Sequence, residues 1–346
     1  MADDKKRIVV LDFLRGMAAL AVVFHHFLGI LNPGLLQSAR YYGQLGVQVF
    51  FVISGFVIPY SLYRGQYALR NYGTFVLKRV TRLDPPYLVT IVVIILLGVF
   101  SWYFSFQQGE VFSVTVPQIL LHFAYINVFF GYPWLADVFW TLAIEFQYYL
   151  LMGLVFPLLF SRKLWIRIPA MVGLGLMPFV ITSPVFIFYF IYLFLMGILT
   201  CQYWIGFIGK REYAGLLVLS VALALLTTGV ASTVAACLAV FAILFLKLDY
   251  ALFRFLGSIS YSLYLIHTPV GKRALNLFLR LTHAQSQAGK LLVVAMALAV
   301  TILAAYLLYR FVERPSQKWS ASFRYHRRRE PEVPRPEETE QFNPAF

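Results

Sequence analysis

Long apolar runs recur along nearly the whole chain and are interrupted by short polar stretches. About 20 consecutive apolar residues let a helix cross the roughly 30 Å hydrocarbon core of a bilayer. The spans that this pattern predicts are Ile8 to Leu31, Leu45 to Tyr63, Tyr87 to Phe106, Val138 to Phe160, Ile168 to Thr182, Pro184 to Trp204, Tyr213 to Thr228, Ser232 to Leu246, Phe253 to Val270 and Leu291 to Val312. The chain is therefore predicted to be all-α, a polytopic transmembrane helix bundle of about ten spans.

Two features near the spans give further local predictions. The apolar piece from Pro117 to Phe130 is too short to span and is expected to be re-entrant or to lie in the membrane interface. Pro315 follows the last span and is expected to end that helix at the inner surface.

The composition excludes a soluble globular protein. Of the 346 residues, 60% are hydrophobic and 18% aromatic, and the 13% that are charged supply too little polar surface to cover a soluble domain. The two cysteines, Cys201 and Cys237, stand in apolar segments without CxxC spacing. Neither a disulfide framework nor a metal site is predicted.

Lysine and arginine are distributed unevenly between alternate loops, and this predicts the orientation. Cytoplasmic loops carry the excess of basic residues near the ends of spans. With the N-terminus inside, the basic residues of the outer loops are Arg40, Lys272, Arg273, Arg280 and Lys290. Both termini are therefore predicted to be cytoplasmic, in a cell membrane that we expect to be the bacterial inner membrane.

The same distribution accounts for the net charge of +14 without a nucleic-acid partner, because inner basic loops suit anionic lipid headgroups and phosphorylated ligands. Residues 1–319 are expected to form the transmembrane domain. The segment 320–346 passes from a basic patch to Pro and Glu without apolar periodicity and is expected to be a disordered cytoplasmic tail. The sequence leaves the oligomeric state open.

The first span carries four ionisable residues, Asp12, Arg15, His25 and His26. A charge at mid-span costs at least about 2.5 kcal/mol on insertion scales, so such groups usually face a protein interior or a wet cavity. In a helix, Arg15 and His26 lie within about 20° of the same face with a rise of about 16 Å between them, whereas His25 points about 100° away. The alternative is structural: Arg15 pairs with Asp12, and the histidines form hydrogen bonds within the bundle.

Further segments carry polar or small residues within apolar surroundings. They read YYGQLGVQVFFVISGFVI at 41–58, LKRVTRLDPPYL at 77–88, FWTLAIEFQYYLL at 139–151, LGSISYSLYLIHTPV at 256–270 and FVERPSQKW at 311–319. Together with LDFLRGMAALAVVFHH at 11–26, in this order and spacing, they resemble the membrane-bound acyltransferase family 3. Members of that family typically transfer acyl groups to cell-surface sugars, and the resemblance covers residues 8 to 319.

The resemblance implies roles for individual residues. Arg15 and His26 match the family's Arg-x10-His signature, in which the histidine is the proposed catalytic base. Arg79 and Arg82 match its basic Arg-x-x-Arg loop, on the side of the membrane where the donor acyl-CoA, expected to be acetyl-CoA, is found. The implied function is O-acylation of a cell-surface or lipid-linked carbohydrate or glycoside by an integral membrane acyltransferase.

The chemistry of these residue types agrees with those roles. Arginine carries a permanent charge and a planar fork that binds phosphate in a bidentate manner, so Arg15, Arg79 and Arg82 suit the phosphate end of acyl-CoA. A neutral imidazole at His26 can accept the proton of a sugar hydroxyl, because its ordinary pKa is near 6.5. Histidine can also act as a nucleophile, so direct transfer and an acyl-histidine intermediate both stay open.

Other polar residues are weaker candidates. Glu145 lies near mid-span, where it is predicted to pair with an arginine, to orient the catalytic histidine or to stay protonated. Asp12 is expected to orient Arg15 rather than to react. Ser54, beside Gly55, allows a ligand to approach the backbone closely, although small residues also serve helix packing.

Two residues of the ninth span complete the candidate set. Tyr261 and His267 are separated by six positions, and His267 lies near the outer end of the span, at a depth similar to that of His26. A shared acceptor site open to the outside is predicted there, with structural hydrogen bonding as the alternative.

Two other classes of function also fit a membrane protein with intramembrane charge. A transporter or flippase of a lipid-linked glycan is expected to show broken helices or internal repeats, and no convincing repeat is present. A non-catalytic membrane scaffold is the third alternative. Neither the acceptor nor the length of the acyl chain can be predicted from the sequence.

Overall fold

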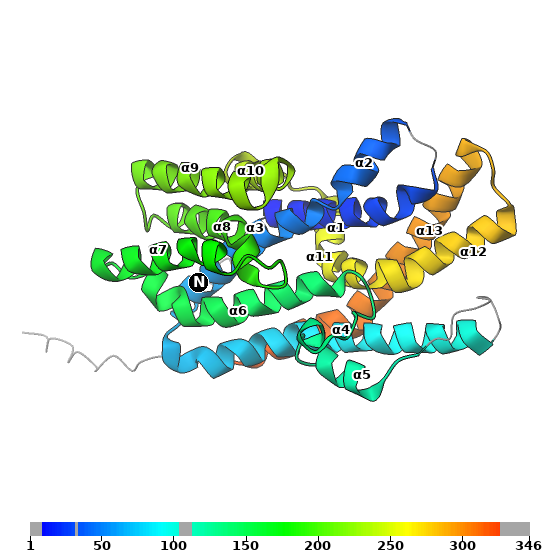
Figure 1. Ribbon diagram of the computed structural model, residues 1–346, viewed down its shortest axis with the longest axis horizontal. Helices are drawn as coiled ribbons and strands as arrows, with labels where there is room; N and C mark the ends of the chain where they lie inside the picture. Colours follow the sequence, from blue (N-terminus) through cyan, green and yellow to red (C-terminus); the bar gives the residue numbers. More distant parts are fainter. Residues whose placement is uncertain (1–8, 32–33, 104–112, 326–346) are drawn as a thin grey trace, which may run out of the picture.

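The computed structural model describes residues 9–31, 34–103 and 113–325, and the regular structure in these ranges is helical. The helices gather into one elongated bundle with most of their axes along its length (Figure 1). Their bounds are α1 Val9–Phe27, α2 Leu35–Gly43, α3 Gly46–Arg64, α4 Tyr72–Tyr103, α5 Val116–His122, α6 Phe139–Leu159, α7 Leu164–Val180, α8 Ile191–Trp204, α9 Lys210–Thr227, α10 Gly229–Phe245, α11 Ala251–Ile266, α12 Arg273–Thr282, α13 Gln287–Leu308 and α14 Arg314–Ser322. Two π-helical segments, η5 (His267–Lys272) and η6 (Tyr309–Glu313), join α11 to α12 and α13 to α14.

The prediction of an all-α membrane bundle is confirmed. Each predicted span overlaps one helix of the structure, from α1 to α13, with α2, α5, α12 and α14 as additional helices. Within the described ranges, six helical stretches are long and apolar enough to cross a bilayer: Val9–Ile30, Gly46–Arg64, Leu69–Tyr103, Phe139–Leu159, Ile187–Trp204 and Gln287–Ser322. Of the other predicted spans, two coincide with the shorter apolar helices α7 and α10, and two overlap α9 and α11.

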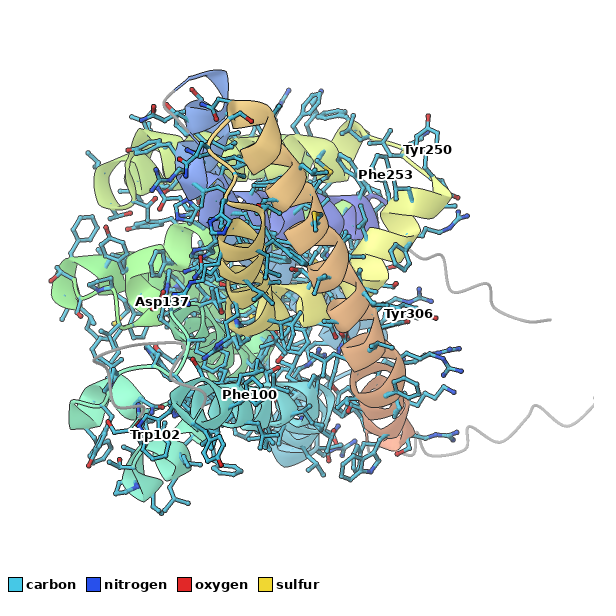
Figure 2. The ribbon with its side chains drawn as sticks, turned by 90° about the vertical axis from the view of Figure 1, so that its right-hand side faces the viewer. Phe100, Trp102, Asp137, Tyr250, Phe253 and Tyr306 are labelled. Carbon is cyan, nitrogen blue, oxygen red and sulfur yellow. The ribbon has the colours of Figure 1, made fainter. Side chains whose placement is uncertain are left out.

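Large apolar side chains cover the outside of the bundle, as expected for contact with lipid. Phe100 and Trp102 of α4 and Tyr306 of α13 lie at this surface, with 55%, 58% and 41% of their area exposed (Figure 2). Many polar and charged side chains are instead buried inside the bundle.

Two helix boundaries differ from the prediction, both at proline. The span predicted to start at Tyr87 belongs to α4, which begins at Tyr72 and continues through Pro85 and Pro86. Residues 77–88 are therefore helix rather than loop. The last span likewise does not end at Pro315, because η6 widens the helix just before it and Pro315 then occupies the first turn of α14, where no backbone N–H is needed.

Close helix contacts fix the relative positions of the central helices. A Cβ atom on Gly55 of α3 would lie 2.3 Å from the carbonyl oxygen of Phe194 in α8, so the backbones touch there. A Cβ atom on Gly257 of α11 would lie 2.5 Å from the carbonyl oxygen of Asp12 in α1. Small residues allow such approach in membrane helix pairs, and the second contact sets α1 firmly against α11.

The segment predicted as a tail begins inside a helix. Residues 320–322 complete α14, and the Lys78 ammonium of α4 donates hydrogen bonds to the carbonyl oxygens of Ser320 (3.0 Å) and Phe323 (2.6 Å). Residues 326–346 lie outside the described residues, and the domain boundary at 319 stays a prediction. The same holds for the depth at which α5 lies in a membrane.

Candidate active site

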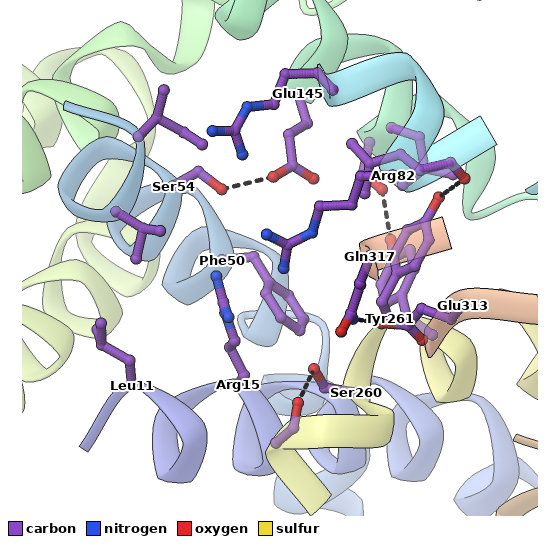
Figure 3. A pocket seen from close by; sticks show the side chains of 18 of the residues that line it. Leu11, Arg15, Phe50, Ser54, Arg82, Glu145, Ser260, Tyr261, Glu313 and Gln317 are labelled. Atoms are coloured by element: carbon purple, nitrogen blue, oxygen red, sulfur yellow. Dashed lines mark hydrogen bonds between the residues drawn. The ribbon is translucent and has the colours of Figure 1, made fainter. Parts of the chain in front are cut away.

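A cavity of about 450 Å³ lies inside the bundle, between helices that are far apart in the sequence (Figure 3). Its walls come from α1, α3, α4, α6, α11 and the η6–α14 helix. The polar residues that line it are Asp12, Arg15, Ser54, Arg79, Arg82, Thr141, Glu145, Tyr149, Ser258, Ser260, Tyr261, Tyr264, Tyr309, Glu313 and Gln317. Most of the residues singled out in the sequence thus meet in one place.

Three arginines face this cavity, Arg15 from α1 and the pair Arg79 and Arg82 from α4. Arg79 and Arg82 are three residues apart on a continuous helix, so they share one face of α4. Arg15 and Arg82 point toward each other across the cavity in Figure 3. The structure therefore brings together the two arginine motifs, which are more than 60 residues apart in the chain.

The Arg79 guanidinium lies against aromatic rings. Arg79 is 8% exposed, and its guanidinium carbon lies 5.3 Å from the Phe75 ring centre and 5.8 Å from that of Tyr149. Its Nε atom has no hydrogen-bond partner among the described residues. Buried cations are usually paired or bind an anion, so this arrangement favours an anionic ligand.

The carboxylate of Glu145 lies in the same cavity, where its hydrogen-bond donors are hydroxyl groups. It accepts hydrogen bonds from the Ser54 hydroxyl, at 2.6 Å, and from the Tyr149 hydroxyl. It also interacts electrostatically with Arg15 and Arg79. Glu145 is therefore a neighbour of the arginines, and the structure gives it no contact with His26.

A second acid of the cavity, Glu313, was missed as a site residue by the sequence reasoning. It is 4% exposed in η6 and accepts hydrogen bonds from the Ser262 hydroxyl (2.5 Å), the Ser262 backbone N–H (3.2 Å) and the Gln317 amide (2.8 Å). Its position beside Pro315 suggested a helix end at the membrane surface. The π-helical turn instead carries it into the protein, a feature that spacing alone does not reveal.

The two histidine candidates meet outside the cavity, toward the opposite end of α1 from Arg15. His26, near the end of α1, and His267, at the start of η5, have ring centres 5.1 Å apart. His267 is fully buried. The centre of the His25 ring lies 5.0 Å from that of the His26 ring, and its Nδ1 atom donates a 2.7 Å hydrogen bond to the carbonyl oxygen of Arg40. The different roles predicted for His25 and His26 stay predictions.

Tyr264 connects the two sites. Its ring lines the cavity beside Phe50, at 5.8 Å between ring centres, and also lies 5.8 Å from the ring of His267. Its hydroxyl shares a 2.6 Å hydrogen bond with Thr141, another residue of the cavity wall. Tyr264 therefore lies between the arginine cavity and the histidine pair.

Tyr261 and His267 lie in different places, and the acceptor site stays a prediction. Tyr261 lines the arginine cavity and donates a 2.9 Å hydrogen bond from its hydroxyl to the carbonyl oxygen of Leu83. His267 lies with His26 instead. Six positions place the two side chains about 120° apart around a helix axis, and His267 lies beyond the end of α11, in η5.

Comparison with known proteins decides the family. Residues 8–310 match the family described as an acyltransferase domain. The chain belongs to this acyltransferase family. The apolar helices described above agree with a protein that is integral to the membrane.

Similar proteins with assigned names include two O-acetyltransferases. The chain is 29% identical to the peptidoglycan O-acetyltransferase OatA of Listeria monocytogenes over 194 residues, 50% of this chain and 28% of the relative. It is 27% identical to the O-acetyltransferase OatA of Staphylococcus aureus over 372 aligned residues, 89% of this chain and 57% of the relative. The chain spans no more than 57% of these relatives.

A third relative has a different name. The chain is 29% identical to nodulation protein 10 of Rhizobium leguminosarum bv. viciae over 181 residues, 46% of this chain and 47% of the relative. No solved structure matches the chain significantly.

Proposed function

We propose that this acyltransferase moves an acyl group, most simply acetyl, from cytoplasmic acyl-CoA to a hydroxyl of a cell-surface or lipid-linked carbohydrate or glycoside. The observation that carries the proposal is the convergence of Arg15, Arg79 and Arg82 on one cavity, where Arg79 is buried and its Nε atom has no hydrogen-bond partner among the described residues. The names of the OatA relatives support O-acetylation as the reaction type.

The phosphates of the donor are assigned to the three arginines. Charge-assisted hydrogen bonds from guanidinium groups to phosphate oxygens are among the strongest polar contacts in proteins. Glu145, Asp12 and Glu313 also line the cavity, where their negative charges partly balance those of the arginines. Ser54 acts by holding Glu145.

The reacting end of the donor is assigned to the histidine pair. Arg15 and His26 belong to the same helix, and the rise between them is about 16 Å, which is comparable to the reach of a pantetheine arm. A donor with its phosphates at the arginines can therefore place its thioester beside His26 once it passes Tyr264.

His26 then acts as the general base. Its neutral imidazole takes the proton of the acceptor hydroxyl, the hydroxyl oxygen bonds to the thioester carbonyl carbon, and the carbon–sulfur bond breaks. The thiolate leaves as CoA and takes up the proton from the imidazolium. A two-step route through an acyl-imidazole has the same overall balance, and rapid quenching after one turnover separates the two routes by the presence of acylated protein.

Acyl transfer by the purified protein in nanodiscs is the deciding experiment, with isotope-labelled acetyl-CoA and short peptidoglycan or lipid-linked oligosaccharides as acceptors. We expect CoA release that depends on the acceptor, with label recovered in an ester of the sugar. His26→Ala is expected to lower the rate by about 10²- to 10⁴-fold and to leave CoA binding unchanged. His25→Ala is the matched control and keeps most of the activity.

Two outcomes contradict the proposal. Full transfer by His26→Ala removes the histidine from the chemistry. Acceptor movement across the membrane without any loss of thioester identifies the protein as a transporter or flippase instead.

A further inference from the structure

His267 carries a buried hydrogen-bond acceptor that has no partner. Its Nδ1 atom lies 2.7 Å from the carbonyl oxygen of Tyr264, and because a carbonyl oxygen only accepts, Nδ1 must carry the proton. The other nitrogen, Nε2, therefore presents a bare lone pair. Nε2 is fully buried and has no hydrogen-bond partner within the described residues.

The local backbone explains how this histidine is held. His267 opens the π-helical segment η5, which contains Pro269. Proline has no backbone N–H, so the carbonyl oxygen of Leu265 lacks its usual donor four residues later and the helix widens into the π form. The bond from Nδ1 to Tyr264 then fixes the ring, and the tautomer is set by the main chain.

The ring of His26 is a close neighbour of the His267 ring. The two ring centres are 5.1 Å apart, with planes inclined by 38°. Two imidazoles joined by an N–H···N bond of about 2.9 Å have centres roughly 5 Å apart. The spacing of the two rings therefore allows a hydrogen bond from a ring N–H of His26 to Nε2 of His267 once His26 rotates about its side-chain bonds.

We propose that His267 is a positioning residue for His26, and this inference rests on the proposed function. Its Nε2 atom accepts the ring N–H of His26 that does not face the acceptor, which selects the tautomer whose free nitrogen points at the hydroxyl. When His26 takes the proton of the hydroxyl, the resulting imidazolium keeps this acceptor. The pair thus resembles a catalytic dyad whose orienting member is a neutral histidine instead of a carboxylate.

Charged and titratable neighbours shape this pair and bear on any pH profile. Lys272 of η5, His25 of α1 and Asp137, in the loop before α6, act electrostatically on His26. Lys272 also acts on His267. Lys272 and Asp137 lie 3.7 Å apart as an ion pair, so their charges largely compensate each other.

The test compares His267→Gln with His267→Met in the nanodisc assay with labelled acetyl-CoA and a working oligosaccharide. The two side chains are similar in size, but only glutamine offers an oxygen acceptor near the position of Nε2. We expect kcat to fall about tenfold to a hundredfold in His267→Met, to recover at least partly in His267→Gln, and the dissociation constant of CoA to stay unchanged in both. The pH profile of kcat should shift in His267→Met and lie closer to the wild type in His267→Gln.

Equal kcat values and unshifted pH profiles in the two variants overturn the inference, because packing alone would then explain His267. Combining His267→Met with His26→Ala sharpens the test, since a residue that acts through His26 adds no further loss. If His26→Ala keeps full activity, the proposed function itself fails. Loss of activity in His26→Ala together with normal kinetics in both His267 variants removes only the positioning role.

Discussion

Arg15 of the arginine cavity and His26 of the histidine pair lie in opposite halves of the same helix, α1, yet the two sites differ in charge and in the groups that they hold. The cavity collects three permanent cations and three acids, whereas the contact between His26 and His267 joins two imidazoles, which are groups that can gain and lose a proton. Permanent charge suits a ligand that is itself permanently charged. Groups that gain and lose a proton suit chemistry, and α1 holds the two at a constant separation.

The difference also teaches how polar groups are kept in a membrane bundle. In the cavity, Glu145 and Glu313 are satisfied by hydroxyl, amide and backbone donors, which leaves the arginines available for a ligand. At the histidine pair, one ring is fixed by a backbone carbonyl and the other is not. The cavity therefore keeps cationic arginines for a ligand, and the histidine pair keeps a basic ring nitrogen without a hydrogen-bond partner among the described residues.

The first prediction concerns the orientation of the two sites in the membrane, with the arginines toward the cytoplasm and the histidines toward the outside. In a background without Cys201 and Cys237, we expect a cysteine at Gln285 to react with an impermeant thiol reagent in intact cells and a cysteine at Gln66 to react only after lysis. Both positions are exposed, so accessibility of the side chain is not limiting. Labelling of position 66 alone would place the arginines on the side without acyl-CoA.

The next largest effect is expected at the cationic site. Arg79→Ala combined with Arg82→Ala should weaken binding of CoA by about 100-fold and flatten its salt dependence, because charge-assisted phosphate contacts are lost. Isothermal titration at two salt concentrations measures both. Arg254→Ala is the matched control, since Arg254 is exposed at the start of α11 and pairs with Asp249 outside the cavity. Unchanged affinity in the double variant would remove α4 from the donor site.

The smallest effect tests how the acids tune that site. Glu313→Gln keeps an oxygen acceptor for Ser262 but removes a negative charge, so we expect CoA to bind about twofold to fivefold more tightly. Glu212→Gln, which touches Arg167 away from the cavity, should leave the affinity unchanged. Weaker binding in Glu313→Gln, with unchanged thermal stability, would mean that the carboxylate holds an arginine in place.

The sequence by itself determined the class of this protein, the position of its apolar helices and its family. These properties depend on local information: the length of an apolar run, the placement of basic residues and the order of short motifs. The separation of Arg15 and His26 also followed from the sequence, because both residues belong to one uninterrupted helix whose geometry is known in advance.

The tertiary structure alone decided which residues meet. Lipid is as apolar as the side chains of the helices, so an apolar span does not reveal which of its faces packs against protein and which faces lipid. The sequence therefore did not show that Glu145 lies with the arginines, that Glu313 is turned inward by η6, or that His267 lies beside His26. Those contacts depend on the close approach of helix backbones at small residues such as Gly257. They also depend on the two π-helical segments, η5 and η6, which lie at or just before a proline.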